Sequence, residues 1–188
     1  EKDWSSAAFW YGWCAANGGE IEITGLSKES CQPDSAAIDI FGRLGVVSEG
    51  TTDGIKLTFK GVESEGVFDV DCRRTPDLAM VLIPTLCRIG RRFAVSGLDT
   101  LDRKESRRGE ALCRELSKYG YVVEWDGNKM SWNGEVCNAY GNPEVYGDHR
   151  MVMAHLILGS RPDLTPLSKS YPALKYFFAK KFGGLEKC

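Results

Sequence analysis

The sequence predicts an α/β domain built from three repeated units. Helical and strand patterns alternate along its 188 residues, and each helical stretch ends at a glycine. A dinucleotide-binding fold is disfavoured, because no Gly-x-Gly-x-x-Gly motif follows a strand. Recurrence of landmarks at a fixed period indicates internal repetition. The matched glycines, 72 to 75 residues apart, are Gly25 with Gly97, Gly45 with Gly120, and Gly54 with Gly127.

The first unit begins with a helix over 4–17, which Asp3 can cap and which Gly18 ends. Alternating polar and apolar residues over 20–24 are typical of a half-buried strand. A second helix is predicted over 34–44, with Asp34 as its cap. The unit closes with a hairpin of two strands, 46–48 and 55–59.

The second unit repeats this order, with a helix over 76–89, a strand over 93–95, a helix over 104–119 and a strand over 121–125. A third, partial copy follows, with helices over 149–158 and 172–182. Lys28-Glu29-Ser30 in the first unit even matches Lys104-Glu105-Ser106 in the second.

Composition narrows the function classes. Lys and Arg total 24 against 26 Asp and Glu, for a formal charge of −2, so a global attraction to nucleic acid or to an anionic membrane is not expected. The sequence contains no run of 18 apolar residues, so no transmembrane helix is predicted. Seven scattered cysteines without a Cys-x-x-Cys pair indicate reduced thiols and no zinc site.

The N-terminal residues lack the basic and apolar regions of a signal peptide and contain no initiator Met. We therefore expect a cytoplasmic protein, and a chain that is a piece of a longer one.

Two charged strings, 102–108 and 148–150, lie where helices are predicted to begin. Basic residues there oppose the helix dipole, and a bound anion would remove the conflict. A carboxylate held among cations is a candidate for proton transfer. The strings therefore predict a site for a small anionic substrate with acid–base chemistry. The alternatives are a solvated first helical turn for 102–108 and a purely structural cap for Asp148.

Three further candidate site residues could instead have purely structural or solvent-exposed roles. Asp77 follows Pro76 at a helix start, where the dipole alone can explain an acid. His149 can be a hydrogen-bonded structural residue. Lys169 can be a solvated loop lysine, although the repeat puts it in the same position before a helix as Lys104.

Several strings together resemble the C-terminal half of the EPSP synthase family of enolpyruvyl transferases. They are Asp3-Trp4-Ser5-Ser6-Ala7, Cys31-Gln32-Pro33-Asp34, Pro76-Asp77-Leu78-Ala79-Met80, Lys104-Glu105-Ser106-Arg107-Arg108, Asp148-His149-Arg150-Met151 and Lys169-Ser170-Tyr171-Pro172. The resemblance implies one lobe of a two-lobe enzyme, in which three α/β units form an inside-out α/β barrel with helices turned inward. Residues 1–188 would be a single domain, and the N-terminal lobe would be its partner.

The resemblance also implies an activity. The family transfers the enolpyruvyl group of phosphoenolpyruvate to the 5-hydroxyl of shikimate 3-phosphate and releases phosphate, in chorismate and aromatic amino acid biosynthesis. No metal or organic cofactor is implied. With half of the site in the other lobe, we expect this chain to be inactive alone.

Residue roles follow from the resemblance by position. Asp77 and Glu105 would be catalytic, as the proton acceptor and as the group that moves the methylene proton. Substrate contacts would come from Lys104 on the shikimate phosphate and from the phosphoenolpyruvate ligands Arg108, Arg150 and Lys169, with His149 beside them. Thr100 stands where some members have an Asn that binds the shikimate phosphate, and Pro33 replaces the usual Gly of a Gln-Gly-Asp turn.

Two other functions remain open at this point. One is the sister transferase that acts on UDP-N-acetylglucosamine, although Lys104-Glu105-Ser106 together with Asp148-His149-Arg150 favours the shikimate enzyme. The other is a non-catalytic anion-binding module.

Overall fold

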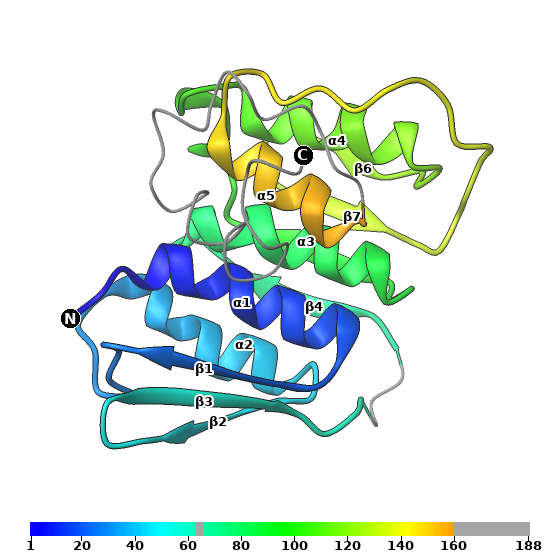
Figure 1. Ribbon diagram of the computed structural model, residues 1–188. Helices are drawn as coiled ribbons and strands as arrows, with labels where there is room; N and C mark the ends of the chain where they lie inside the picture. The colour runs from blue at the N-terminus through cyan, green and yellow to red at the C-terminus, as the bar shows by residue number, and fades with distance from the viewer. Residues whose placement is uncertain (63–65, 160–188) are drawn as a thin grey trace, which may run out of the picture.

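The structure is a computed structural model that describes residues 1–62 and 66–159. Lys169 and the predicted helix over 172–182 lie outside the described residues. Along the described part, helices and strands alternate in the predicted order (Figure 1). None of its helices is long and apolar enough to cross a membrane.

The first unit has the predicted order of elements, but its second helix is shorter than predicted. Asp34 does not cap it, because this residue lies inside a 3₁₀ turn and accepts a hydrogen bond from Ser5 instead. The unit comprises α1 (Trp4–Asn17), β1 (Glu20–Thr24), a 3₁₀ turn η1 (Pro33–Ala36), α2 (Ala37–Gly42), β2 (Val46–Gly50) and β3 (Gly54–Phe59). The side chain of Asp3 caps α1 by accepting from the Ser5 and Ser6 amides. The three strands form an antiparallel sheet in the order β1-β3-β2.

The second unit adds strands that we did not predict. It comprises β4 (Phe68–Asp71), a 3₁₀ turn η2 (Pro76–Leu78), α3 (Ala79–Arg88), β5 (Phe93–Ser96), a 3₁₀ turn η3 (Leu101–Arg103), α4 (Arg108–Lys118), β6 (Glu124–Trp125) and β7 (Met130–Trp132). Its sheet has the order β4-β5-β7-β6, in which β4 runs parallel to β5 and the other neighbours are antiparallel. Helix α5 (His149–Ile157) follows and begins the third unit.

The predicted repetition is confirmed for the two units that are described over their length. The order β5-β7-β6 has the same connectivity and antiparallel pairing as β1-β3-β2. Gly25 and Gly97 share a left-handed backbone, with φ of 79° and 76°, as do Gly45 and Gly120, with φ of 81° and 91°. The third landmark pair differs, because Gly54 begins β3 whereas Gly127 lies in the turn between β6 and β7.

Two boundaries in the second unit were also wrong. Helix α4 begins at Arg108 rather than at 104, because Lys104 is extended and the Asp102 carboxylate caps the helix from outside its first turn. Asp102 Oδ1 accepts a hydrogen bond from the Gly109 amide at 2.7 Å. The strand predicted over 121–125 is paired as β6 over its last two residues, and Tyr121 forms an isolated bridge with Val136.

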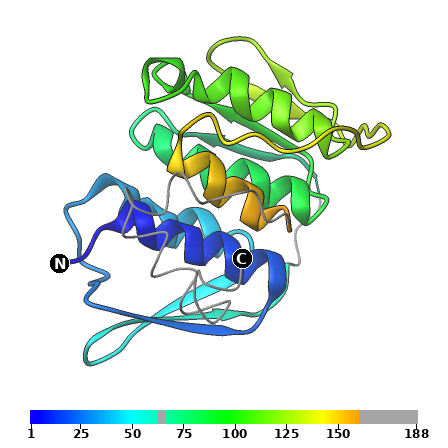
Figure 2. The same ribbon diagram turned by 45° about the horizontal axis from the view of Figure 1, so that its top comes forward.

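The helices lie inside, as predicted. Nine of the ten residues of α3 are buried, which is typical of a helix enclosed by protein on all sides. Helices α1, α3 and α5 pack against one another and begin at the same end of the domain (Figures 1 and 2). One apolar core connects them with both sheets. Their common direction brings Asp3, Asp77 and Asp148, which precede or open these helices, to one end of the molecule.

Candidate functional site

The site is organised around a buried ion pair between Arg108 and Asp148. Arg108, the first residue of α4, is 1% exposed, and Asp148, which caps α5, is fully buried. Arg108 Nε donates to Asp148 Oδ2 at 2.8 Å and its Nη2 donates to Oδ1 at 3.3 Å. Burial by itself would raise the pKa of Asp148, but the hydrogen bonds and charge of Arg108 outweigh it and lower that pKa below its usual value. Both groups are therefore charged at pH 7.

Asp77 contacts three cations, one from α4, one from the segment before α4 and one from α5. It lies in η2, the turn that leads into α3, and its side chain is 23% exposed. Arg108 Nη1 donates to its Oδ1 at 3.0 Å. Its Oδ2 lies 3.5 Å from Lys104 Nζ and 3.6 Å from Arg150 Nη2. The carboxylate of Asp77 thus occupies the point where the positive charges meet.

The segment before α4 folds onto the same ion pair. Glu105 accepts a hydrogen bond from Arg108 Nη2, and its side chain is about half exposed. Ser106 Oγ donates to Asp148 Oδ2 at 2.9 Å. We define the Arg108 cluster as Asp77, Lys104, Glu105, Arg108, Asp148 and Arg150. Its three cations and three carboxylates cancel in formal charge.

Arg150 and His149 come from the first turn of α5. The Arg150 amide donates to Asp148 Oδ1 at 2.9 Å, so the cap also fixes the backbone at this residue. His149 Nδ1 lies 3.9 Å from the same oxygen. Burial and the charge of Arg150 lower the pKa of His149 despite Asp148, which keeps its imidazole neutral at pH 7.

The conflict between Arg108 and the helix dipole is resolved by the protein itself. Four hydrogen bonds from its guanidinium reach Asp148, Asp77 and Glu105, which leaves one of its five N–H groups. Lys104, whose side chain is 34% exposed, and Arg150 approach Asp77 at longer distances. Their donors are therefore easier for an incoming anion to recruit than those of Arg108.

Sequence reasoning missed Asp34 as a neighbour of the site. This carboxylate is mostly buried in η1 and accepts a hydrogen bond from Ser5 Oγ. Burial raises the pKa of Asp34, and nearby Asp77 acts in the same direction, whereas Ser5 and Arg150 lower it. The signal was available, because Pro33-Asp34 repeats the Pro-Asp pair that marks Asp77.

Two predicted site residues are not joined to the cluster by the described contacts. Thr100 precedes η3, and its buried hydroxyl has no hydrogen-bond partner among residues 1–62 and 66–159. Lys169 lies beyond that part of the chain. Arg107, next to Arg108, is exposed and pairs with Glu110 on the surface.

The fold is that of an enolpyruvyl transferase lobe. A solved EPSP synthase from Acinetobacter baumannii matches 96% of this chain with a TM-score of 0.62 and 19% sequence identity, over 45% of its own length.

The chain belongs to the EPSP synthase (3-phosphoshikimate 1-carboxyvinyltransferase) family, whose sequence model matches residues 1–174. Curated relatives of that name include one from Bacteroides fragilis, 37% identical over 92% of this chain and 44% of its own length. Another, from Methanopyrus kandleri, is 32% identical over 85% of this chain and 36% of its own length. The chain thus spans less than half the length of these relatives.

Proposed function

We propose that the Arg108 cluster is this chain's contribution to a site that transfers the enolpyruvyl group of phosphoenolpyruvate to shikimate 3-phosphate. The observation that carries the proposal is Asp77, a carboxylate that meets Lys104, Arg108 and Arg150 at once. The names of the curated relatives favour shikimate 3-phosphate over UDP-N-acetylglucosamine as the acceptor.

The chemistry needs what the cluster offers. The 5-hydroxyl of shikimate 3-phosphate adds to C2 of phosphoenolpyruvate, its proton goes to a base, and C3 gains a proton. C3 then loses a proton, the alkene re-forms and phosphate leaves C2. Asp77 would take the hydroxyl proton, and Glu105 would give and retake the proton on C3.

The cations would offset charge on the reacting anions. Lys104 and Arg150 lie 3.5 and 3.6 Å from Asp77 Oδ2 and could turn to a phosphate or a carboxylate. Arg108 would keep Asp77, Glu105 and Asp148 in fixed positions relative to one another. When phosphoenolpyruvate binds, Glu105 would leave Arg108, whose Nη groups would then donate to the substrate. Lys169 would supply a further cation from the third unit, and His149 and Thr100 would line the site.

The remaining anchors for shikimate 3-phosphate would come from an N-terminal lobe. Holding two substrates in line contributes about 7–11 kcal/mol to a well-oriented reaction, so the 188-residue chain alone should turn over little. We place the protein in the cytoplasm, which suits the six cysteines that are free in the described ranges.

The test measures binding and turnover separately. Calorimetric titration of the chain with phosphoenolpyruvate should show weak binding that Arg150→Met reduces roughly ten- to hundredfold, since such a contact is worth about 1.5–3 kcal/mol. The exposed Arg107→Met is the matched control and should bind like the wild type. Phosphate release from both substrates should need an added N-terminal lobe. Equal loss in both Arg variants, or full turnover by the chain alone, would contradict the proposal.

A further inference from the structure

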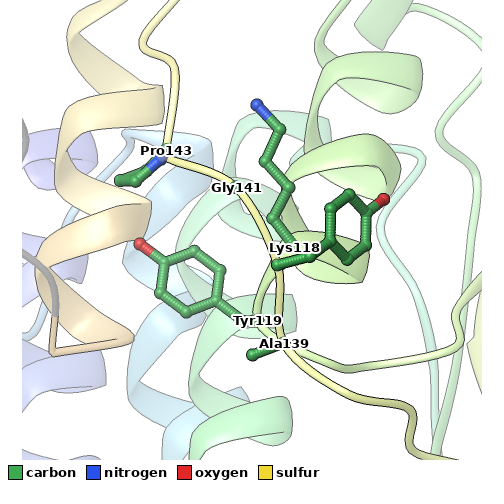
Figure 3. Close-up of a pocket in the computed structure, with 6 residues that line it drawn as sticks. Lys118, Tyr119, Ala139, Gly141 and Pro143 are labelled. Atoms are coloured by element: carbon green, nitrogen blue, oxygen red, sulfur yellow. The ribbon is translucent and has the colours of Figure 1, made fainter.

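A long loop, residues 133–147, delivers the start of α5 to the site. Residues 133–142 are all exposed, so the loop buries little apolar surface. It passes over the C-terminal turn of α4, above an open cavity of ≈ 410 Å³ lined by Lys118, Tyr119, Ala139, Tyr140, Gly141 and Pro143 (Figure 3). Packing can therefore contribute little to the course of residues 133–142, whereas Val145 and Tyr146 do pack against the core. Hydrogen bonds connect the loop to both helices.

Glu115, a fully buried carboxylate in α4, holds the loop from one side. Its Oε2 accepts from the Glu144 amide at 3.0 Å, and its Oε1 accepts from the Tyr146 hydroxyl at 2.6 Å. Lys118 Nζ pairs with the same carboxylate at 2.9 Å and donates to the Asn142 carbonyl at 3.0 Å. A buried carboxylate is retained only when its oxygens are satisfied in this way.

His155, a fully buried residue of α5, holds the loop from the other side. Its Nε2 lies 2.8 Å from the Glu144 carbonyl, and its Nδ1 lies 3.0 Å from the Tyr119 hydroxyl. Because a carbonyl can only accept, Nε2 carries the hydrogen and Nδ1 accepts from Tyr119. The two peptide groups that flank the Glu144 α-carbon are thus fixed, one from α4 through its N–H and the other from α5 through its C=O.

Two residues after Glu144, the backbone adopts an unfavourable conformation. Tyr146 has φ of 52°, a left-handed conformation that non-glycine residues rarely adopt. The Asp148 amide then donates to the Val145 carbonyl at 2.8 Å, which closes a tight turn directly before α5. The bond from Tyr146 to Glu115 stabilises this turn.

We infer that Glu115, Tyr146 and His155 are positioning residues that set where Asp148, His149 and Arg150 stand relative to Arg108. Helices α4 and α5 are joined at the site end by Arg108 and Asp148, and farther along by Tyr119 and His155. The loop between them is held in place by its hydrogen bonds to Glu115. The catalytic consequence, though not the positioning itself, rests on the proposed function.

The experiment compares two Tyr→Phe substitutions in the same loop. Tyr146→Phe removes the bond to Glu115, and Tyr140→Phe removes an exposed bond of 2.8 Å to Ser117 Oγ, also on α4. Amide hydrogen exchange of Arg150, whose N–H is held by Asp148, is followed in the wild-type and variant chains. Exchange should be at least tenfold faster in Tyr146→Phe and within twofold of wild type in Tyr140→Phe. Amides of β1 and β3 should not change in either variant, which establishes that the fold is intact.

A second measurement separates this inference from the proposed function. Phosphoenolpyruvate affinity should fall at least fivefold in Tyr146→Phe and not in Tyr140→Phe. If the wild-type chain binds no phosphoenolpyruvate, the proposed function fails, and the exchange data alone decide the positioning. Equal Arg150 exchange in the two Phe variants would overturn the inference. Glu115→Met, which has a similar length but accepts from neither the Glu144 amide nor the Tyr146 hydroxyl, should speed Arg150 exchange at least as much as Tyr146→Phe.

Discussion

Gly12, near the middle of α1, should tolerate no side chain, because α1, α3 and α5 meet there. In Gly12→Ala the new Cβ would lie 2.5 Å from Val81 Cγ2, 2.7 Å from Thr85 Oγ1 and 3.1 Å from Ile157 Cδ1. The first two distances are too short for any Cβ contact, so the Val81 and Thr85 side chains or α1 itself must shift. Because this packing brings the helix starts of the site to one end, the substitution tests the arrangement on which the site depends.

The magnitude follows from two opposing effects. Replacing a helical Gly by Ala favours the helix by about 1 kcal/mol. Overpacking a filled core costs about 1–3 kcal/mol. Thr85 cannot yield freely, because its buried hydroxyl donates to the Val81 carbonyl at 2.7 Å, and losing a buried hydrogen bond costs about 1–3 kcal/mol more. A net destabilisation of about 2 kcal/mol lowers the melting temperature by about 4–8 °C in a chain of this length.

Gly42→Ala in α2 is the matched control. No atom lies within 4 Å of the position of its Cβ, and its backbone is not left-handed, so the same substitution should be neutral or stabilising by up to about 1 kcal/mol. Thermal unfolding followed by circular dichroism measures both variants. The reasoning is refuted if Gly12→Ala melts at or above the wild-type temperature, or if the two variants shift alike. Val81→Ala in the Gly12→Ala background should recover part of the loss.

Three other outcomes follow from the charged groups. Asp148→Asn should destabilise the chain by about 3–5 kcal/mol in urea unfolding, because it removes the fully buried counter-charge that binds two nitrogens of Arg108. A change below about 1 kcal/mol would mean that Asp77 and Glu105 suffice. Since the pKa of Asp148 is lower in the folded chain, its contribution is complete above about pH 4, the unfolded value, and is lost as the pH falls through the folded pKa. The gap between Asp148→Asn and wild type should accordingly narrow from pH 7 to pH 3. Burial lowers the pKa of His155, so the unfolded state binds more protons and stability should fall as the pH drops below about 6.5; the slope between pH 7 and pH 5 should flatten in His155→Gln.

Local rules were enough to predict much of this molecule. The cap at Asp3, the glycine ends of α1 and α3 and the alternation in β1 depend on a few neighbouring residues, and the structure places each as expected. The glycine spacing predicted the repetition, because two copies of one unit need a left-handed residue at the same turn. Asp148 was predicted as a possible cap from its position alone, and it does cap α5.

Contacts between distant residues were beyond such rules. The four-residue error at the start of α4 arose because Asp102 caps from outside the first turn, which no local pattern signals. Strand β4 is defined by parallel pairing with β5 across a whole helix. Asp34 approaches the site from another unit, through packing rather than through sequence proximity.

The sequence by itself determined which residues could carry the chemistry, because residue type and helix-start position select cations and carboxylates. Tertiary structure alone decided how they pair. Burial makes an unpaired charge costly. Arg108, which is buried at the start of α4, therefore pairs with Asp148, Asp77 and Glu105, over separations of up to 40 residues. The same cost explains Glu115 and His155, which no motif marked, and which the fold buries against the loop that leads to the site.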